Sequence, residues 1–156
     1  MKIKFDSSQA YQQQAVAAFT DLFEGQPLNQ GDFTVTINAK NQSVSNNLSL
    51  FAVELGAIGN NITLHHDDIY KNLVATQEHN DIEPISRAEF DKNGLNFSVE
   101  METGTGKTYV YLRTIFELSQ KYGFKKFVIV VPSVAIREGT LKNLEITAEH
   151  FKSLYN

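Results

Sequence analysis

The stretch SVEMETGTGKTYVYL, residues 98–112, decides the fold expected of this chain. The segment LNFSVEM that leads into it predicts a strand, and TYVYLRTIFELSQKY after it predicts a helix with one apolar face. Between them, ETGTGK ends in Gly106 and Lys107, which together with Thr108 match the end of the pattern G-x-x-x-x-G-K-[ST]. Met101 stands where this pattern has its first glycine. A glycine-rich loop between a strand and a helix predicts a phosphate-binding site.

The residue types of this loop suit the binding of phosphate. Gly104 and Gly106 allow the backbone to curl with its N–H groups turned inward at the start of a helix, an arrangement that favours anions. Lys107 is expected to reach the β- and γ-phosphates, and the hydroxyl of Thr108 is expected to bind Mg²⁺. A Gly-Lys-Thr string also occurs by chance. Its position between a strand and a helix favours the phosphate site.

The residues after this helix predict a parallel sheet. Gly123 ends the helix, and the segment KFVIVV follows, apolar at every position from Phe127 to Val131. Such a segment is typical of a strand that is buried on both faces. Strand, helix and strand form a βαβ unit whose crossover is expected to be right-handed, and Pro132 precedes a further helix. The fold class predicted is therefore α/β.

Two zones precede this unit. Residues 1–27 contain DSSQAYQQQAVAAFTDLFEGQP, which predicts a helix with an apolar face and a Gly and Pro stop. Residues 28–94 are polar and rich in Asn and Gln, with a strand predicted in DFTVTINAK and a short helix in HHDDIYKNLVATQ. The expected organisation is an N-terminal helix in 1–27, a mixed middle region in 28–94 and the P-loop unit in 95–156.

A row of metal-ligating residue types, HHDD at 65–68, lies in the middle region. Helical metal ligands prefer spacings of three or four, because adjacent side chains do not converge on one ion. The row therefore favours the acidic first turn of a helix over a metal site.

Composition excludes several classes of protein. The 156 residues are 42% hydrophobic and 21% charged, as in an ordinary globular domain. There is no cysteine, which excludes disulfides and thiolate metal sites, and there is no apolar run of membrane-spanning length. The net charge of −4 argues against tight, nonspecific binding of nucleic acid by this chain alone. These features predict a cytoplasmic protein.

Three segments carry a resemblance to a known family. METGTGKT, followed at a short interval by FVIVVPSVAIREGT, resembles motifs I and Ia of superfamily 2 helicase-like ATPases. These segments are similar in particular to the restriction (Res) subunit of type III restriction-modification enzymes, and YQQQAV at 11–16 resembles the segment that precedes motif I there. The resemblance implies a partial RecA-like P-loop lobe, in which a parallel sheet with flanking helices has a polar insertion before the P-loop.

The resemblance also implies roles for individual residues. The phosphates of ATP would be held by Thr103, Gly104, Thr105, Gly106, Lys107 and Thr108. Gln12 would hydrogen-bond the adenine edge beside Tyr11, although a glutamine in this run can also be merely solvated on its helix. Ser133 and Arg137 would face the DNA backbone. Ser133 also suits the N-cap of the following helix, and Arg137 also suits an ion pair with a surface carboxylate.

The catalytic residues for ATP hydrolysis are unknown, because the acidic Walker B pair is absent from this sequence. Hydrolysis in this class requires two carboxylates on a later strand, and no aspartate follows Asp91. The chain therefore resembles the N-terminal part of an ATP-dependent, DNA-translocating restriction endonuclease subunit that works with a methyltransferase (Mod) partner. By itself the chain is expected to bind Mg-ATP weakly, without turnover.

Other functions stay open at this point. The motor subunit of a type I restriction enzyme, or another superfamily 2 DNA helicase, would share the architecture. A small phosphotransferase would use the same loop, although the missing aspartates count against it. A non-catalytic nucleotide-binding or interaction remnant would need no acidic pair at all.

Overall fold

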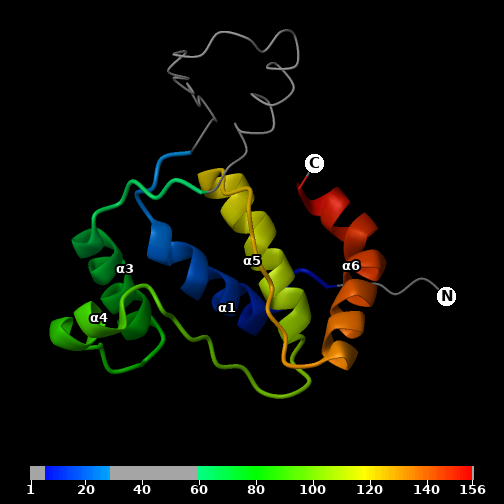
Figure 1. Ribbon diagram of the computed structural model, residues 1–156, viewed down its shortest axis with the longest axis horizontal. Coiled ribbons are helices and arrows are strands. Elements are labelled where there is room, and N and C mark those ends of the chain that lie inside the picture. The colour runs from blue at the N-terminus through cyan, green and yellow to red at the C-terminus, as the bar shows by residue number, and fades with distance from the viewer. Residues whose placement is uncertain (1–5, 29–59, 156) are drawn as a thin grey trace, which may run out of the picture.

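The computed structural model describes residues 6–28 and 60–155, and the elements in these ranges are helical (Figure 1). They are α1 (Ala10–Thr20), the short 3-10 helix η1 (Asp21–Phe23), α3 (His66–His79), α4 (Arg87–Asn93), α5 (Lys107–Tyr122) and α6 (Val134–Tyr155). The strand predicted in DFTVTINAK lies outside the described residues. No helix within the described ranges combines the length and the apolar character that crossing a membrane requires.

The predicted α/β fold is wrong for the part of the chain that the structure describes. Neither LNFSVEM nor KFVIVV forms a strand, and residues 6–28 and 60–155 contain no sheet, so a parallel-sheet RecA-like lobe is not present there. The side chains of Val128 and Val130 are 85% and 88% exposed, whereas the prediction required burial on both faces. An apolar segment becomes a strand only when a neighbouring strand takes its backbone hydrogen bonds.

A side chain supplies such bonds at the start of KFVIVV. The Oδ1 atom of Asn60 accepts from the backbone N–H groups of Lys125 and Lys126, and its Nδ2 atom donates to the carbonyl of Lys126 at 2.8 Å. The segment then runs back along α5 from its C-terminal end to the start of α6 (Figure 1). As a result, α5 and α6 begin at the same end of the molecule.

The long helix α5 forms as its apolar stripe predicts. Its buried residues face two neighbours: Leu118 and Tyr122 pack in the cluster with Phe23 and Phe124, and Leu112 packs with Phe151 of α6. Gly123 follows in the left-handed conformation with a φ of 72°, and its N–H bonds the carbonyl of Ser119, which ends the helix.

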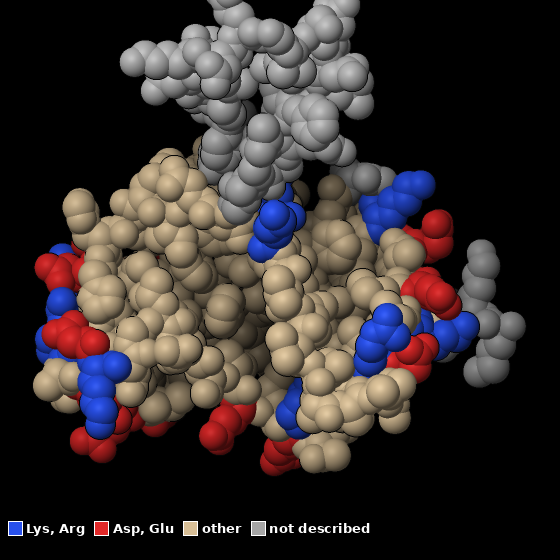
Figure 2. Space-filling view, in the orientation of Figure 1, with Lys and Arg blue, Asp and Glu red and all other residues tan. Residues whose placement is uncertain are grey.

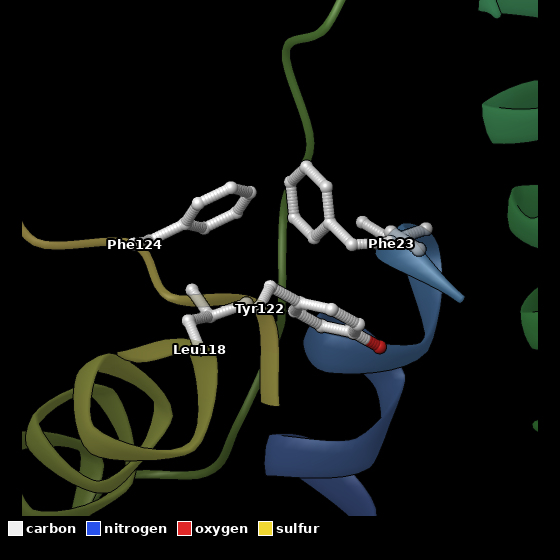
Figure 3. Close-up of a cluster of buried hydrophobic side chains, with 5 residues drawn as sticks. Phe23, Leu118, Tyr122 and Phe124 are labelled. Atoms are coloured by element: carbon white, nitrogen blue, oxygen red, sulfur yellow. The ribbon is translucent and has the colours of Figure 1, made fainter. Parts of the chain in front are cut away.

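An aromatic cluster joins the end of α1 to the end of α5 (Figure 3). Phe23 and Phe124 meet edge to face with ring centroids 5.4 Å apart, and Leu118 and Tyr122 pack against them. The hydroxyl of Tyr122 donates to the carbonyl of Thr20 at 3.0 Å, so its one polar group is satisfied inside the cluster. Burying side chains of this size contributes roughly 1.5–3 kcal/mol each. The cluster therefore holds α1 against α5.

The row HHDD begins a helix, as predicted. α3 starts at His66 with His65 as its N-cap, and the acidic residues Asp67 and Asp68 lie in its first turn. Asp67 pairs with Arg87 of α4 at 2.7 Å, and Arg87 holds the pKa of the Asp67 carboxyl below its usual range. The described residues contain no group of three or more His, Asp and Glu side chains placed to hold a metal ion.

Candidate functional site

The glycine-rich loop turns sharply and opens onto the start of α5. Gly104 and Gly106 have φ values of +83° and +86°, a backbone conformation that side-chain-bearing residues rarely adopt. Gly106 is the N-cap of α5, and no side chain caps this end. Because the first N–H groups of a helix have no partner inside it, those at the start of α5 are directed toward the loop. The predicted turn into a helix is thus confirmed, although no strand precedes it.

The loop is closed by bonds to the backbone carbonyl of Glu102. The hydroxyl of Thr105 donates to this carbonyl at 2.7 Å, and the ammonium group of Lys107 donates to the same oxygen at 2.7 Å. Glu102 and Lys107 are exposed, and Thr108 is partly exposed in the first turn of α5. A cationic group and a hydroxyl therefore lie beside the backbone amides of the turn. This combination of donors suits an anion.

Gln12 is built into the loop from the side of α1. Its side chain is only 7% exposed, and its Nε2 atom donates to the carbonyl of Thr105 at 2.9 Å. A Cβ atom added to Gly106 would lie 2.7 Å from the same Nε2 atom. The interpretation of Gln12 as a solvated member of a Gln run is therefore wrong. Tyr11 lies beside it with a 48% exposed side chain.

A cavity of about 990 Å³ adjoins the loop. Its wall includes Tyr11 and Phe19 of α1, Leu73 of α3 with Asn80 just after that helix, and the segment 96–102. Thr105 lies at its border with the loop. The cavity has room for a planar, partly polar group beside Tyr11.

Ser133 and Arg137 lie at the start of α6 and make local contacts. The Ser133 Oγ atom accepts from the backbone N–H of Ile136 at 3.3 Å, so the predicted N-cap is confirmed. Arg137 donates to the Glu138 carboxylate at 2.7 Å, and both side chains are exposed, which confirms the surface ion pair. Their predicted contact with DNA stays a prediction. Their helix begins at the end of the molecule where the loop also lies (Figure 1).

A polar network beside α5 was not predicted from the sequence. Arg113 donates to the carbonyl of Ser7 at 2.7 Å, and the Tyr155 hydroxyl donates to the Glu117 carboxylate at 2.8 Å. The Arg113 and Glu117 side chains are only 11% and 19% exposed. Burial, followed by the bond to Glu117, raises the pKa of Tyr155 well above its usual range. The spacing of Arg113 and Glu117 by four residues was the available signal, since it puts both on one helix face.

The face of the molecule crossed by KFVIVV carries few charges. Figure 2 shows that its centre is uncharged, whereas Lys, Arg, Asp and Glu side chains gather toward its edges. This face therefore shows no broad basic surface.

Comparison with known proteins identifies relatives of one kind. The family model described as "Type III restriction enzyme, res subunit" matches residues 7–154. The chain is 42% identical over 96 residues to the EcoPI Res subunit of Escherichia phage P1, which covers 60% of this chain and 10% of that protein. It is 47% identical over 74 residues to the StyLTI Res subunit of Salmonella typhimurium, covering 46% of this chain and 7% of that protein. It is 38% identical over 96 residues to the EcoP15I Res subunit of Escherichia coli, covering 60% of this chain and 10% of that protein. The aligned stretch thus spans a tenth or less of these relatives.

Proposed function

Because the chain belongs to the Res-subunit family of type III restriction enzymes, we propose that its loop at residues 101–108 binds the phosphates of ATP. The proposal rests most on one observation: two left-handed glycines lead directly into a helix that no side chain caps. Backbone N–H groups at such a position favour a multiply charged anion. In this proposal the loop is the nucleotide-binding part of an ATP-dependent, DNA-translocating restriction endonuclease subunit.

Lys107 and Thr108 are the side chains that we assign to the bound nucleotide. The Lys107 ammonium now donates to the neutral carbonyl of Glu102. A phosphate oxygen is a stronger acceptor than a neutral carbonyl, because it carries a negative charge that attracts the ammonium group. We expect Lys107 to exchange the carbonyl for the β- and γ-phosphates. Mg²⁺, when bound with ATP, would neutralise phosphate charge, and the Thr108 hydroxyl is the protein ligand that we assign to it.

The adenine base of ATP is assigned to the side of the loop that α1 covers. Tyr11 lines the cavity next to the loop, and its exposed ring offers a stacking surface for adenine. Gln12 lies against the loop, and we retain its predicted role in reading the adenine edge. Since its Nε2 atom donates to Thr105, this role requires either the Oε1 atom or a change of partner.

Nucleotide binding is proposed for this chain without turnover. The sequence contains no aspartate after Asp91, so it has no acidic pair of the kind that holds Mg²⁺ and activates water. Cleavage of DNA, translocation and association with a methyltransferase (Mod) subunit are proposed for a full-length subunit of this family. Ser133 and Arg137 are the proposed contacts with the DNA backbone, because both lie at an exposed helix start on the side of the loop.

Calorimetric titration with Mg-ATP tests this function. Lys107→Ala is expected to weaken binding at least about tenfold, since it removes the cation that faces the phosphates. Lys121→Ala is the matched control, because Lys121 lies in the last turn of the same helix, away from the loop, and pairs with the exposed Asp21 at 4.0 Å. Equal affinity of the Lys107→Ala variant and the unsubstituted chain would contradict the proposal.

A further inference from the structure

The polar network around Arg113 connects three parts of the chain that are distant in sequence. Arg113 and Glu117 lie one turn apart on α5 with 3.8 Å between Nε and Oε1. Arg113 reaches the carbonyl of Ser7 ahead of α1, and Glu117 accepts from the hydroxyl of Tyr155, the last residue of α6. The two charged side chains therefore connect α5 to the segment before α1 and to α6.

The geometry of this network contributes little to the stability of the folded chain. The Nε atom of Arg113 is buried and makes no hydrogen bond to any described residue, although a carboxylate oxygen is nearby. Removing two charges from water is costly, and a buried pair with incomplete hydrogen bonds does not recover that free energy. An apolar pair of similar size would be at least as stable in this place. A buried polar network that adds little stability can still specify how elements are placed.

The apolar contacts beside the network do not define one position of α6. Tyr155 stacks on Phe116 with ring planes only 10° apart, and Phe116 also meets Phe151 at a centroid distance of 4.8 Å. Flat stacked rings slide past one another with little loss of contact, because dispersion is not directional. Hydrogen bonds are directional, and among the described residues the two helices share bonds from Tyr155 to Glu117 at 2.8 Å, between Tyr111 and Thr140 at 2.9 Å, and between Tyr109 and His150 at 2.9 Å. The bond from Tyr155 is the one of these that holds the last residue of α6.

We propose that Arg113 and Glu117 are positioning residues that, together with the Tyr111–Thr140 and Tyr109–His150 bonds, fix α6 relative to α5, and with it the distance between the two functional ends of these helices. This inference rests on the proposed function, in which α5 begins at the nucleotide loop and α6 begins at Ser133 and Arg137. Tyr155 lies at the opposite end of α6 from Ser133, and because a helix is stiff, a slide of α6 at Tyr155 moves its start by a similar amount. Neither positioning residue touches the nucleotide.

Distance measurement tests the inference without nucleotide. The chain has no cysteine, so Gln120→Cys on α5 and Glu149→Cys on α6, both exposed positions, provide a unique pair of spin-label sites. Pulsed electron paramagnetic resonance should give one narrow distance in the otherwise unsubstituted chain. The double variant Arg113→Met/Glu117→Leu leaves no orphan charge, and we expect it to keep its melting temperature while its distance distribution becomes broad.

Two further variants complete the test. Tyr155→Phe keeps the ring on Phe116 and removes only the hydroxyl, so its distance distribution is expected to broaden as in the double variant. If the double variant does not fold, Tyr155→Phe alone decides whether the network positions α6. Lys142→Met/Glu145→Leu removes an exposed ion pair on α6 with 3.3 Å between its atoms, and it should leave the distance narrow. Mg-ATP affinity is expected to fall about tenfold in the network variants, as is usual for coupling between sites.

The possible outcomes separate the two proposals. A narrow, unchanged distance in Tyr155→Phe and in the double variant would overturn the positioning role, whatever the affinity for nucleotide. A lower melting temperature with a narrow distance would also overturn it, because it would show a purely stabilising role. If the unsubstituted chain fails to bind Mg-ATP, the proposed function fails, and the distance measurement still decides the positioning role.

Discussion

Substitution of Gly106 by alanine examines the contact between α1 and the loop. The φ of +86° at this position is left-handed, which costs an alanine about 1–2 kcal/mol. The new Cβ would also lie 2.7 Å from the Nε2 atom of Gln12, too close for any real contact. Gln12 must then move and give up its bond to Thr105, at a further cost of about 1 kcal/mol. We therefore expect Gly106→Ala to lower the free energy of unfolding by about 2–3 kcal/mol.

Gly104→Ala is the matched control for this substitution. Its φ of +83° carries the same backbone penalty, but nothing lies within 4 Å of the added Cβ. The expected loss is thus only about 1–2 kcal/mol. The difference of about 1 kcal/mol between the two variants isolates the contact with Gln12, and it should disappear when both are made in a Gln12→Ala background.

Urea denaturation followed by circular dichroism measures both variants in both backgrounds. Midpoints are compared at equal slope, since a changed slope would indicate a changed denatured state. If Gly106→Ala and Gly104→Ala are equally destabilised while Gln12 is present, the reasoning about this contact is refuted. A difference that persists in the Gln12→Ala background would refute it as well, because the clash would then have another source.

Three further predictions concern the core, the pH dependence and the start of α6. Phe124→Ala should lower the free energy of unfolding, measured by thermal denaturation, by about 3–5 kcal/mol, because Phe124 is only 4% exposed. Val130→Ala is the control: its position is 88% exposed, and it should change the free energy of unfolding by less than about 0.5 kcal/mol. Burial and Glu117 raise the pKa of Tyr155, so above about pH 10 the folded chain keeps a proton that the unfolded chain releases. The free energy of unfolding, measured by urea denaturation at several pH values, should therefore fall as the pH rises above about 10. The fall should be less steep in the Tyr155→Phe variant, which has no hydroxyl to titrate at this position. Ser133→Ala removes the side-chain acceptor for the first turn of α6, so it should lower the free energy of unfolding by about 1 kcal/mol and speed amide hydrogen exchange in that turn. Ser133→Asp supplies another capping oxygen and should keep those amides protected from exchange.

The helices of this chain follow from local properties of the sequence. The stripe that predicted α5, the glycine that ends it and the acidic start of α3 all act within one or two turns. The loop is local too, since Gly104 and Gly106 permit φ values that other residues resist. Such features need no partner elsewhere in the chain, which is why they could be predicted.

The predicted sheet shows the limit of local reasoning. The run from Phe127 to Val131 is apolar at every position, and the sequence pattern alone cannot say whether a strand lies beside it. In the described part of the chain, the backbone of Lys125 and Lys126 bonds the side chain of Asn60 rather than another strand. The side chains of Val128 and Val130 are exposed, as expected of a segment that no neighbouring strand pairs with in the described part of the chain.

By itself, the sequence determined where the glycine-rich loop lies, which residues begin and end its helix, and the family to which the chain belongs. Only the tertiary structure decided that Gln12 is buried against Thr105, and that Arg113 and Glu117 connect α5 to Ser7 and Tyr155. Backbone conformation and helix propensity depend on neighbours along the chain, so they can be inferred from the amino-acid sequence. A hydrogen bond between residues 93 positions apart depends on how helices pack, and packing is a property of the whole chain.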